Sequence, residues 1–194
     1  MKRAVDILLS SLALLTLVPI LALIAVAIVM DSGWPIFYRQ ERVGRWFQMF
    51  RIWKFRSMTM SHEGPLITVR GDTRVTRVGR VLRATKLDEL PQLWNVVRGD
   101  MSLVGPRPEI PEYVAMFANR YKDVLAVRPG ITDLASVQFR DEEYVLARVP
   151  DSVEYYARKL LPAKLELAEE YLRKRSFLFD LSILLQTFKA VLHI

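Results

Sequence analysis

An uncharged run of twenty-four residues near the amino terminus constrains the fold more than any other feature of this chain. It extends from Ile7 to Met30, and charged residues stand on both sides of it. As a helix the run is about 36 Å long, against roughly 30 Å for the hydrocarbon core of a bilayer. It is also longer than the hydrophobic region of a signal peptide, which spans roughly 7 to 15 residues. The run therefore predicts a membrane helix.

Two features bear on how this helix meets the bilayer. Pro19 divides the run into two arms, and a proline inside a helix removes a hydrogen bond and clashes with the preceding turn, so we expect a sharp bend. Positive residues mark the cytoplasmic side, and they occur on both flanks, at Lys2 and Arg3 and again six times between residues 39 and 56. A re-entrant helix satisfies both flanks, whereas a spanning helix satisfies one. Prolines also occur in spanning helices, so these residues alone leave both topologies open.

Residue usage and charge limit the chemistry. The chain has no Cys, which excludes thiolate metal sites and thiol nucleophiles, and His62 and His193 are too far apart in sequence to suggest a histidine-based metal cluster. Fourteen Arg and Lys stand against six acidic residues between Ser32 and Arg107, whereas the net charge of the whole chain is +7. This basic region predicts an anionic partner, which could be nucleic acid, anionic lipid headgroups or a phosphorylated substrate.

The chain after the membrane run has the pattern of a mostly helical α+β domain. Strand-forming residues around Gly44 favour a β-hairpin over residues 35–54, and residues 61–72 favour a loop. Helical patterns cover residues 111–127 and residues 151–175, and we expect Pro162 to break the second into two helices. Residues 177–192 are too polar to span a membrane and favour an interfacial helix. We expect a membrane helix over residues 1–31 and one further domain over residues 32–194.

Four arginines recur at every third position in the basic region, at Arg74, Arg77, Arg80 and Arg83. On one helix this spacing forms a stripe along one face. Such a stripe suits a solvated surface, a nucleic-acid surface or contact with lipid headgroups. The arginines alone do not choose among these.

An adjacent acid pair, Asp88 and Glu89, directly precedes a helix predicted from Pro91 to Val97. Free N–H groups and the dipole at a helix start stabilise ionised carboxylates and nearby phosphate oxygens. Thr85 and Asp88 also match a capping box, however, so a purely structural role for Asp88 stays open. The pair is a candidate active site only if the rest of the chain supports phosphate chemistry.

Several cations are candidates for binding phosphate. Arg107 lies between two prolines that fix the backbone, which suits bidentate capture of a phosphate or carboxylate. Arg128 precedes a Pro-Gly turn. Lys54 and Arg56 belong to the stretch KFRSM, and by themselves they are interpreted as a solvated strand end.

Five stretches occur together in a familiar order: the uncharged run with its central proline, KFRSM at residues 54–58, LDELPQLWN at 87–95, SLVGPRPE at 102–109 and RPGIT at 128–132. Over essentially its whole length the chain resembles the small monotopic phosphoglycosyl transferases of the bacterial sugar transferase family. The resemblance implies a re-entrant membrane helix bent at Pro19, a short β-hairpin and amphipathic interfacial helices around a single cytoplasmic domain. The chain departs from the family in having Val18 before the proline, where serine is usual, and Asp133 after RPGIT, where glycine is frequent.

The resemblance also implies a reaction. Such enzymes transfer a sugar 1-phosphate from a UDP-sugar to undecaprenyl phosphate at the cytoplasmic face of the bacterial inner membrane and release UMP. Asp88 would attack the sugar-bearing phosphorus to form a covalent phosphosugar intermediate and would bind Mg²⁺, while Glu89 would act either at the metal or in proton handling. The cations assigned to phosphate oxygens are Lys54, Arg83, Arg107 and Arg128.

Partners and alternatives follow from the same features. Anionic membrane lipids are expected around the protein, nucleic acid is not, and a homodimer is compatible with a chain bound at an interface. A membrane-tethered nucleic-acid-binding module is an alternative on the arginine spacing, although the chain lacks helix-turn-helix, zinc and RNA-binding signatures. A membrane-anchored phosphohydrolase using the same acid pair is a third hypothesis, and it would release sugar phosphate to water. The sugar itself cannot be predicted from these residues.

Overall fold

The computed structural model describes residues 2–60 and 67–192, so the loop expected at residues 61–72 is described only from residue 67, and His62 and His193 lie outside the described residues. The helices are α1 (Lys2–Ser32), α2 (Arg77–Ala84), α3 (Gln92–Arg98), α4 (Pro111–Met116), α5 (Ala118–Val124), α6 (Leu134–Gln138), α7 (Glu142–Leu146), α8 (Ser152–Tyr155), α9 (Leu161–Lys174) and α10 (Phe177–Leu192). The strands are β1 (Phe37–Val43), β2 (Met49–Phe55), β3 (Ser102–Val104) and β4 (Gly130–Thr132). Short turns of tighter or wider helix are η1 (Arg45–Phe47), η2 (Leu87–Glu89) and η3 (Tyr156–Leu160). The expected mostly helical α+β fold is confirmed.

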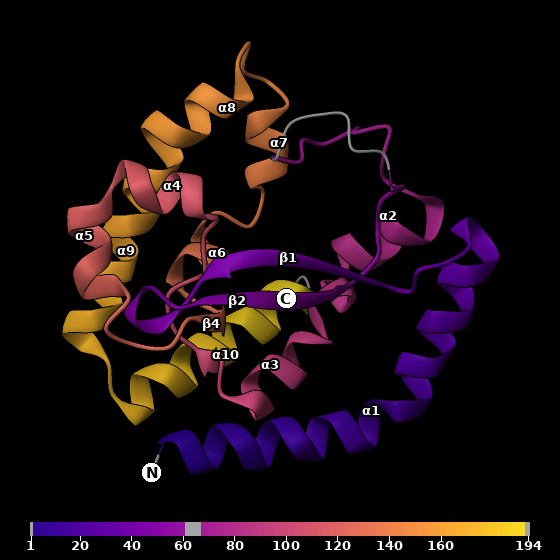
Figure 1. The fold of residues 1–194 in the computed structure, drawn as a ribbon, viewed down its shortest axis with the longest axis horizontal. Helices are drawn as coiled ribbons and strands as arrows, with labels where there is room; N and C mark the ends of the chain where they lie inside the picture. The colour runs from indigo at the N-terminus through magenta and orange to yellow at the C-terminus, as the bar shows by residue number, and fades with distance from the viewer. Residues whose placement is uncertain (1, 61–66, 193–194) are drawn as a thin grey trace.

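Helix α1 is long, apolar and bent. Figure 1 shows it running along the base of the molecule and then turning upward along one side. Pro19 lies inside the helix, and we attribute the bend to it because an interior proline removes a backbone hydrogen bond. Most of the large apolar side chains along the helix are exposed, Leu15 at 72% among them. The helix is long and apolar enough to cross a membrane by length and composition, and little of its apolar stretch is buried within the protein.

The first turn of α1 is fastened to the globular body by charged side chains. The Arg3 guanidinium donates to the carbonyls of Val96 at 2.7 Å and Val97 at 3.2 Å, near the carboxyl end of α3, where a cation is favoured by the helix dipole. Buried Asp6 accepts a hydrogen bond from the Ser102 hydroxyl at 2.8 Å. The amino terminus of α1 therefore packs against α3 and β3.

The last turn of α1 is held by the same body. Asp31 accepts a hydrogen bond from the backbone N–H of Val78 at the start of α2, at 3.0 Å. Buried Arg56, from the end of β2, donates to the Ser32 hydroxyl and to the carbonyl just beyond it. Ile24 and Ile28 pack with Phe55 and neighbouring side chains in one core cluster. Both ends of the apolar helix thus contact one globular domain, as a bent helix allows and a straight spanning helix would not.

Strands β1 and β2 form the expected antiparallel hairpin, with Phe37 paired to Phe55 and Val43 paired to Met49. The turn is longer than the sequence predicted, since residues 45–47 form η1 instead of continuing the strand. Buried Asn95 on α3 binds strand β2. Its side chain accepts a hydrogen bond from the N–H of Trp53 and donates one to the carbonyl of Arg51. The motif LWN therefore fixes α3 against β2.

A second, parallel strand pair was not predicted. Strands β3 and β4 pair Ser102 with Gly130 and Val104 with Thr132. The backbones approach so closely just beyond β3 that a Cβ on Gly130 would lie 2.1 Å from the nitrogen of Gly105. Only glycine fits there. The pairing of β3 with β4 also positions the segment after β3, which carries Arg107.

Two helical predictions need correction. The helix expected over residues 111–127 is two helices, α4 and α5, because Phe117 leaves the helical region with φ −128° and ψ 35°. Pro162 does not break the next segment. Instead α8, η3 and α9 continue one another, and Pro162 lies in the first turn of α9, directly after the π-helical turn η3. The wider turn accommodates a proline that cannot donate a hydrogen bond.

The predicted arginine stripe is also wrong in part. Helix α2 begins at Arg77, so Arg74 lies before it and pairs with Asp72 at 2.7 Å. On the helix, Arg80 is exposed whereas Arg83 is partly buried and directed elsewhere. The four arginines therefore do not form one stripe on a single helix, because Arg74 lies outside α2.

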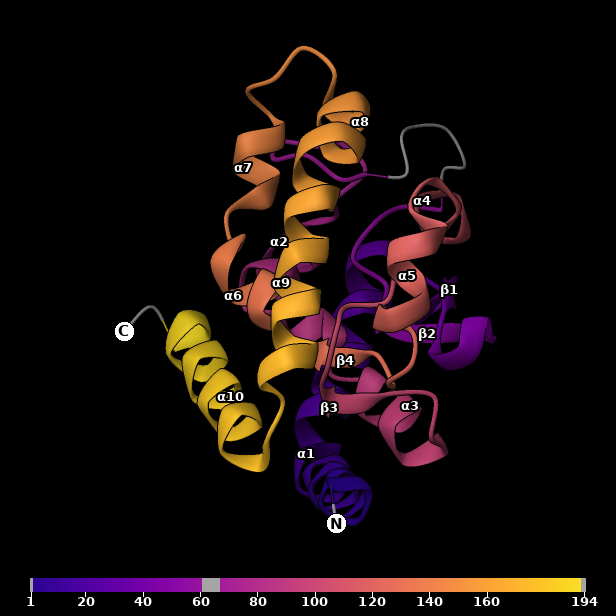
Figure 2. The ribbon, with the colours of Figure 1, turned by 90° about the vertical axis from the view of Figure 1, so that its left-hand side faces the viewer.

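Helix α9 packs at the centre of the globular body. Its buried side chains Leu161, Leu165 and Ala168 pack into core clusters with α5, η3 and the end of β1. Figure 2 shows α9 upright at the centre of the view, with α6 and α7 beside it, α10 on the flank and α1 at the base. Helix α10 contacts β3, β4 and α6 and leaves Leu178 and Phe188 among its exposed side chains. Helices α1 and α10 therefore both expose large apolar side chains.

Candidate active site

Asp88 and Glu89 belong to the short turn η2, which follows α2 directly. Lys86 between the two elements has a left-handed backbone, with φ 58°, so the chain turns sharply before the acid pair. Helix α3 starts at Gln92 with Pro91 as its cap. The predicted place of the pair, just before a helix start, is confirmed to within one residue.

The capping box predicted from Thr85 and Asp88 is wrong. Thr85 ends α2, and its hydroxyl donates to the carbonyls of Val81 and Leu82, one turn earlier. Asp88 is buried, and its Oδ1 has no hydrogen-bond partner among the described residues. A buried, unpaired carboxylate oxygen is costly to the fold, so Asp88 is held in place for something other than helix capping.

The two carboxylates have opposite electrostatic environments. Burial raises the pKa of Asp88, with Lys54 opposing the shift. Burial alone would also raise the pKa of Glu89, but Arg107 and Lys54 outweigh it and hold that pKa well below its usual range. Oε1 of Glu89 accepts from Lys54 Nζ at 2.7 Å and from Arg107 Nη2 at 2.6 Å. Glu89 therefore pairs with two cations, whereas Oδ1 of the adjacent Asp88 has no hydrogen-bond partner in the described part of the chain.

The pKa values of Lys54 and Arg107 shift in opposite directions. Burial lowers the pKa of Lys54 despite the pull of Glu89, because desolvation disfavours the ammonium ion. Glu89 raises the pKa of Arg107, which stays charged. Lys54 is at the end of β2 and only one-fifth of its side chain is exposed, so its interpretation as a solvated strand end is wrong.

Arg107 is positioned by the segment that follows β3. Flanking prolines fix its backbone, and its own N–H donates to the carboxylate of Asp133 at 3.2 Å. Asp133 also caps α6 by accepting from the N–H of Ser136 at 2.7 Å. The sequence showed Asp133 only as a departure from the family after RPGIT, but this residue supports both a helix start and the backbone of Arg107.

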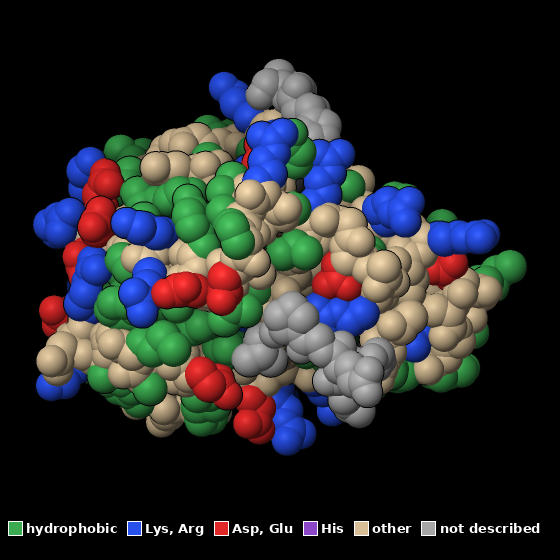
Figure 3. All heavy atoms as spheres, turned by 90° about the horizontal axis from the view of Figure 1, so that it is seen from above, with side chains coloured by type: hydrophobic (Ala, Val, Ile, Leu, Met, Phe, Trp, Pro, Cys, Tyr) green, Lys and Arg blue, Asp and Glu red, His purple; other side chains and the backbone are tan. Residues whose placement is uncertain are grey.

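The acid pair opens onto a cavity of about 760 Å³. Its described lining includes nine cations and five carboxylates, which are Arg42, Lys54, Arg56, Arg74, Arg83, Lys86, Arg107, Arg140 and Lys164 together with Asp88, Glu89, Glu109, Glu142 and Glu143. Figure 3 shows the face of the molecule opposite the amino-terminal arm of α1, where many Lys and Arg side chains gather among acidic ones. An excess of positive charge around an unpaired carboxylate suits an anionic substrate.

The structure brings most of the predicted cations to this cavity. Arg83 lines it from α2 and pairs with Glu143, and its Nε is buried without a partner in the described part of the chain. Arg83 also lowers the pKa of Asp88, although less than Lys54 does. Arg128 does not line the cavity: its Nε donates to the carbonyl of Gly99 at 2.8 Å. The structure therefore does not place Arg128 with the other candidates.

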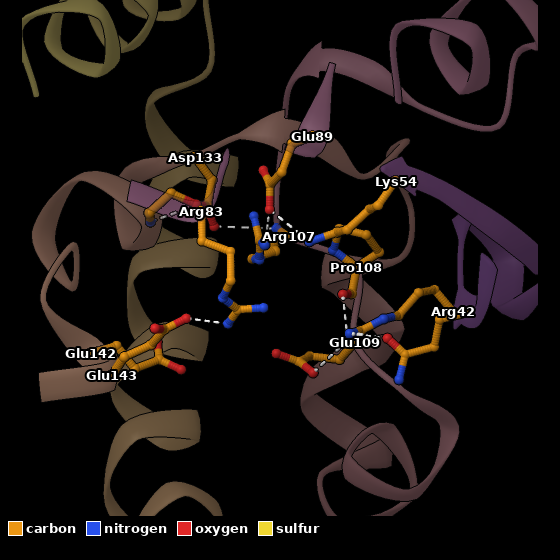
Figure 4. Close-up of polar contacts among 12 residues, drawn as sticks. Arg42, Lys54, Arg83, Glu89, Arg107, Pro108, Glu109, Asp133, Glu142 and Glu143 are labelled. Atoms are coloured by element: carbon orange, nitrogen blue, oxygen red, sulfur yellow. Dashed lines mark hydrogen bonds and ion pairs between the residues drawn. The ribbon is translucent and has the colours of Figure 1, made fainter. Parts of the chain in front are cut away.

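A further polar group in the cavity was missed from the sequence. Buried Glu109 accepts from the Tyr156 hydroxyl at 2.5 Å and from Arg42 at 3.2 Å, and Lys164 lies 3.3 Å from the same hydroxyl. Figure 4 shows Glu109 and Arg42 together, apart from the group formed by Glu89, Lys54 and Arg107. Glu109 closes the motif SLVGPRPE, which was the available signal, but its partners are distant in sequence.

The donor atoms allow one magnesium arrangement. Residues 2–60 and 67–192 include no group of three His, Cys, Asp or Glu side chains that could hold a metal by themselves. Mg²⁺ in phosphate enzymes takes one or two carboxylates and completes its shell with water and substrate phosphate oxygens. Oδ1 of Asp88 is available for this, whereas Oε1 of Glu89 is occupied by two cations. The residues present fit an ion held jointly by Asp88 and a bound phosphate.

Comparison with known proteins identifies the family. The family model described as bacterial sugar transferase matches residues 1–194. The chain is 40% identical to a UDP-glucose:undecaprenyl-phosphate glucose-1-phosphate transferase of Caulobacter vibrioides, over 98% of this chain and 69% of that protein. It is 37% identical to the protein of the same name from Escherichia coli K12, over 96% of this chain and 39% of that protein.

A relative with a different sugar in its name is about as similar. It is a UDP-N-acetylgalactosamine-undecaprenyl-phosphate N-acetylgalactosaminephosphotransferase of Aeromonas hydrophila, 44% identical over 70% of this chain and 33% of that protein. The chain thus spans well under half of the Escherichia and Aeromonas relatives. The resemblance noted from the sequence and the expectation of a transferase are confirmed, because the family match covers the whole chain: this protein belongs to the bacterial sugar transferase family.

Proposed function

We propose that this protein transfers a sugar 1-phosphate from a UDP-sugar to undecaprenyl phosphate and releases UMP. The observation that carries the proposal is Asp88, a buried carboxylate at the wall of a large basic cavity, whose Oδ1 has no partner among residues 2–60 and 67–192. The relatives named above supply the class of donor and acceptor, since each name couples a UDP-sugar to undecaprenyl phosphate. Two anions that must react with each other favour a stepwise path through an enzyme group.

In the first step a carboxylate oxygen of Asp88 attacks the phosphorus that carries the sugar. The bond from that phosphorus to the bridging oxygen breaks, and UMP leaves with the bridging oxygen and its electron pair. The product is a covalent phosphosugar on Asp88. In the second step a phosphate oxygen of undecaprenyl phosphate attacks the same phosphorus, the bond to Asp88 breaks, and the carboxylate is restored.

The cations have distinct tasks in this scheme. Arg107 is permanently charged and rigidly presented, which suits it to hold a phosphate group in place. Lys54 lies near enough to Asp88 to favour its ionised, attacking form. Glu89 keeps both cations aligned in the absence of substrate. Arg83 offers a free Nε to a phosphate oxygen.

Mg²⁺ belongs to the proposal on the chemistry of the donor set. Asp88 would hold it together with substrate phosphate oxygens. When bound, the ion would neutralise part of the diphosphate charge. Removal of divalent cations by a chelator should abolish UMP release, and addition of Mg²⁺ should restore it.

The membrane arrangement is proposed from the exposed apolar surfaces of α1 and α10. Residues 1–31 would enter the cytoplasmic leaflet and return, because both ends of α1 are tied to the same domain, and residues 32–194 would stay at the cytoplasmic face. Exposed side chains such as Leu15 and Leu178 would contact lipid. Labelling of single cysteines placed before and after α1 should give the same side; labelling from opposite sides would exclude re-entry.

The reaction is tested by measuring UMP released from UDP-sugars by protein in detergent. Release should require undecaprenyl phosphate for turnover, and a radiolabelled sugar phosphate should remain on the denatured protein when the lipid is omitted. Asp88→Asn should abolish both signals. Full activity of that variant would refute the mechanism, and sugar phosphate released to water without lipid would identify a phosphohydrolase.

A further inference from the structure

One polar group in the cavity has no task in the transfer step. It consists of Arg42, Glu109, Tyr156, Lys164 and Glu142, which we name the Glu109 cluster. Glu109 joins Tyr156 and Arg42, and Lys164 joins the Tyr156 hydroxyl to Glu142, at 3.3 Å and 2.5 Å. All five side chains line the cavity that contains Asp88.

The charge of this cluster differs from that of the phosphate-binding group. Its two cations are matched by two carboxylates, so the cluster is neutral when all four are ionised. Around Asp88, by contrast, four cations (Lys54, Arg83, Lys86 and Arg107) outnumber three acids (Asp88, Glu89 and Glu143). A neutral network of donors and acceptors suits an uncharged polar ligand, whereas a cationic group suits phosphate.

The cluster retains free bonding capacity. The Glu109 carboxylate has about four lone-pair sites and uses two of them, for Tyr156 and Arg42. Nε of Arg42 is a buried donor without a partner within the described residues. Burial and the neighbouring Glu109 raise the pKa of Tyr156 well above its usual value, so its hydroxyl keeps its proton. The cluster can therefore both accept from and donate to a hydroxyl-bearing molecule.

Backbone spacing connects the cluster to the phosphate site. Arg107 and Glu109 are two residues apart on one proline-bounded segment, and residues that precede prolines are extended. Extended chain rises about 3.1 to 3.3 Å per residue, which separates the two positions by roughly 6 to 7 Å. This is about the distance from a phosphorus atom to the far hydroxyls of a sugar attached to it.

The π-helical turn η3 completes the cluster. An extra residue in that turn brings Tyr156 and Lys164 onto one face of the continuous helical segment, two turns apart. Lys164 Nζ lies 4.6 Å from the centre of the Tyr156 ring, and the ring of Tyr113 lies 4.9 Å from it. With the tyrosine ring covered in this way, the cluster offers hydrogen-bonding edges instead of a stacking face for a nucleobase.

We propose that Arg42, Glu109 and Tyr156 form the subsite for the ring hydroxyls of the transferred sugar. This rests on the proposed function, because it takes the sugar from the same UDP-sugar that Asp88 attacks. Glu109 accepts from ring hydroxyls, and Arg42 donates to them. The subsite would make the protein bind a UDP-sugar more tightly than UDP and would set the preference among sugars that differ in a ring substituent.

The test compares binding of UDP-glucose, UDP-N-acetylgalactosamine and UDP to the full chain by titration calorimetry, with divalent cations chelated so that no UMP is formed. Glu109→Gln and Tyr156→Phe keep the shapes of the side chains. We expect each to weaken binding of the preferred UDP-sugar about 10-fold, to leave the affinity for UDP within about 2-fold and to change the ratio between the two sugars. Glu169→Gln breaks a similar ion pair, with Arg120 at 2.7 Å outside the cavity, and should leave all three affinities unchanged.

Several results would overturn the subsite. An equal loss of affinity for UDP would assign the cluster to the nucleotide, and wild-type protein that binds UDP-sugars no more tightly than UDP would exclude a sugar subsite. Unchanged sugar ratios with a lowered melting temperature in both variants would make the cluster purely structural. Failure of the proposed function would give a different result from failure of the subsite. Binding would still depend on the sugar, but no UMP would be released when undecaprenyl phosphate and Mg²⁺ are present.

Discussion

Replacing Glu89 by Gln should destabilise the protein strongly, because it removes the one charge that pairs with two buried cations. Oε1 of Glu89 lies 2.7 Å from Lys54 and 2.6 Å from Arg107, and the Glu89 side chain is 12% exposed. Removing one partner of a buried ion pair costs about 3–5 kcal/mol. Lys54 can shed its proton, since its pKa is already lowered by burial, so we expect a loss of about 3 kcal/mol, at the lower end of that range.

For a chain of this size the loss corresponds to a fall of about 6–12 °C in melting temperature. The pKa of Glu89 is depressed in the folded state, so its contribution is present at neutral pH and is lost as the pH falls through the folded value. The difference in melting temperature between wild type and Glu89→Gln should therefore be largest at pH 7 and should shrink as the medium is made strongly acidic.

The assay is thermal unfolding in detergent at several pH values. Glu41→Gln is the matched control, because Glu41 pairs with Arg51 at 3.4 Å with both side chains about 60% exposed, and exposed pairs contribute little. Lys54→Met combined with Glu89→Gln should recover part of the loss, since one stranded cation is removed. A fall below about 3 °C for Glu89→Gln, or one equal to that of the control, would refute the assignment of Glu89 as the charge that organises this group.

Three further predictions address the same site. Asp88→Asn should abolish UMP release yet raise the melting temperature at neutral pH, because the raised pKa of Asp88 means that ionisation costs stability as pH rises; the gain should vanish in acid, and a loss at neutral pH would contradict it. Lys54→Met should shift the acidic limb of the kcat/KM profile to higher pH, because Lys54 lowers the pKa of Asp88; an unshifted limb would exclude that coupling. Gly130→Ala should destabilise the fold by several kcal/mol, since its Cβ would lie 2.1 Å from Gly105 N, and a melting temperature equal to wild type would disprove the close contact.

Local patterns predicted much of the architecture. Strand-forming residues and Gly44 located the hairpin, and the apolar run with Pro19 located the bent helix. The errors came where a local rule was overridden by its surroundings. Pro162 was expected to end a helix, but the π-helical turn before it preserves continuity, and Thr85 matched a capping motif but ends the preceding helix instead.

The candidate site was predicted unevenly for a similar reason. Lys54, Arg83 and Arg107 line the cavity with Asp88 as expected, whereas Arg128 does not. The supporting residue Asp133 and the whole Glu109 cluster were missed, because no periodicity links Glu109 to Arg42, which precedes it by 67 residues, or to Tyr156, which follows it by 47. Side chains from distant segments converge only after the chain has folded.

The sequence by itself determined which groups can take part: one long helix too apolar for water, a carboxylate pair beside a helix start, and an excess of cations suited to phosphate. Only the tertiary structure decided how the two carboxylates differ. Asp88 and Glu89 are adjacent and chemically alike, yet Glu89 meets Lys54 and Arg107 from β2 and from the segment after β3, while Oδ1 of Asp88 meets no described partner. Desolvation and ion pairing depend on distances in space, and those distances are set by packing between segments that the sequence keeps apart.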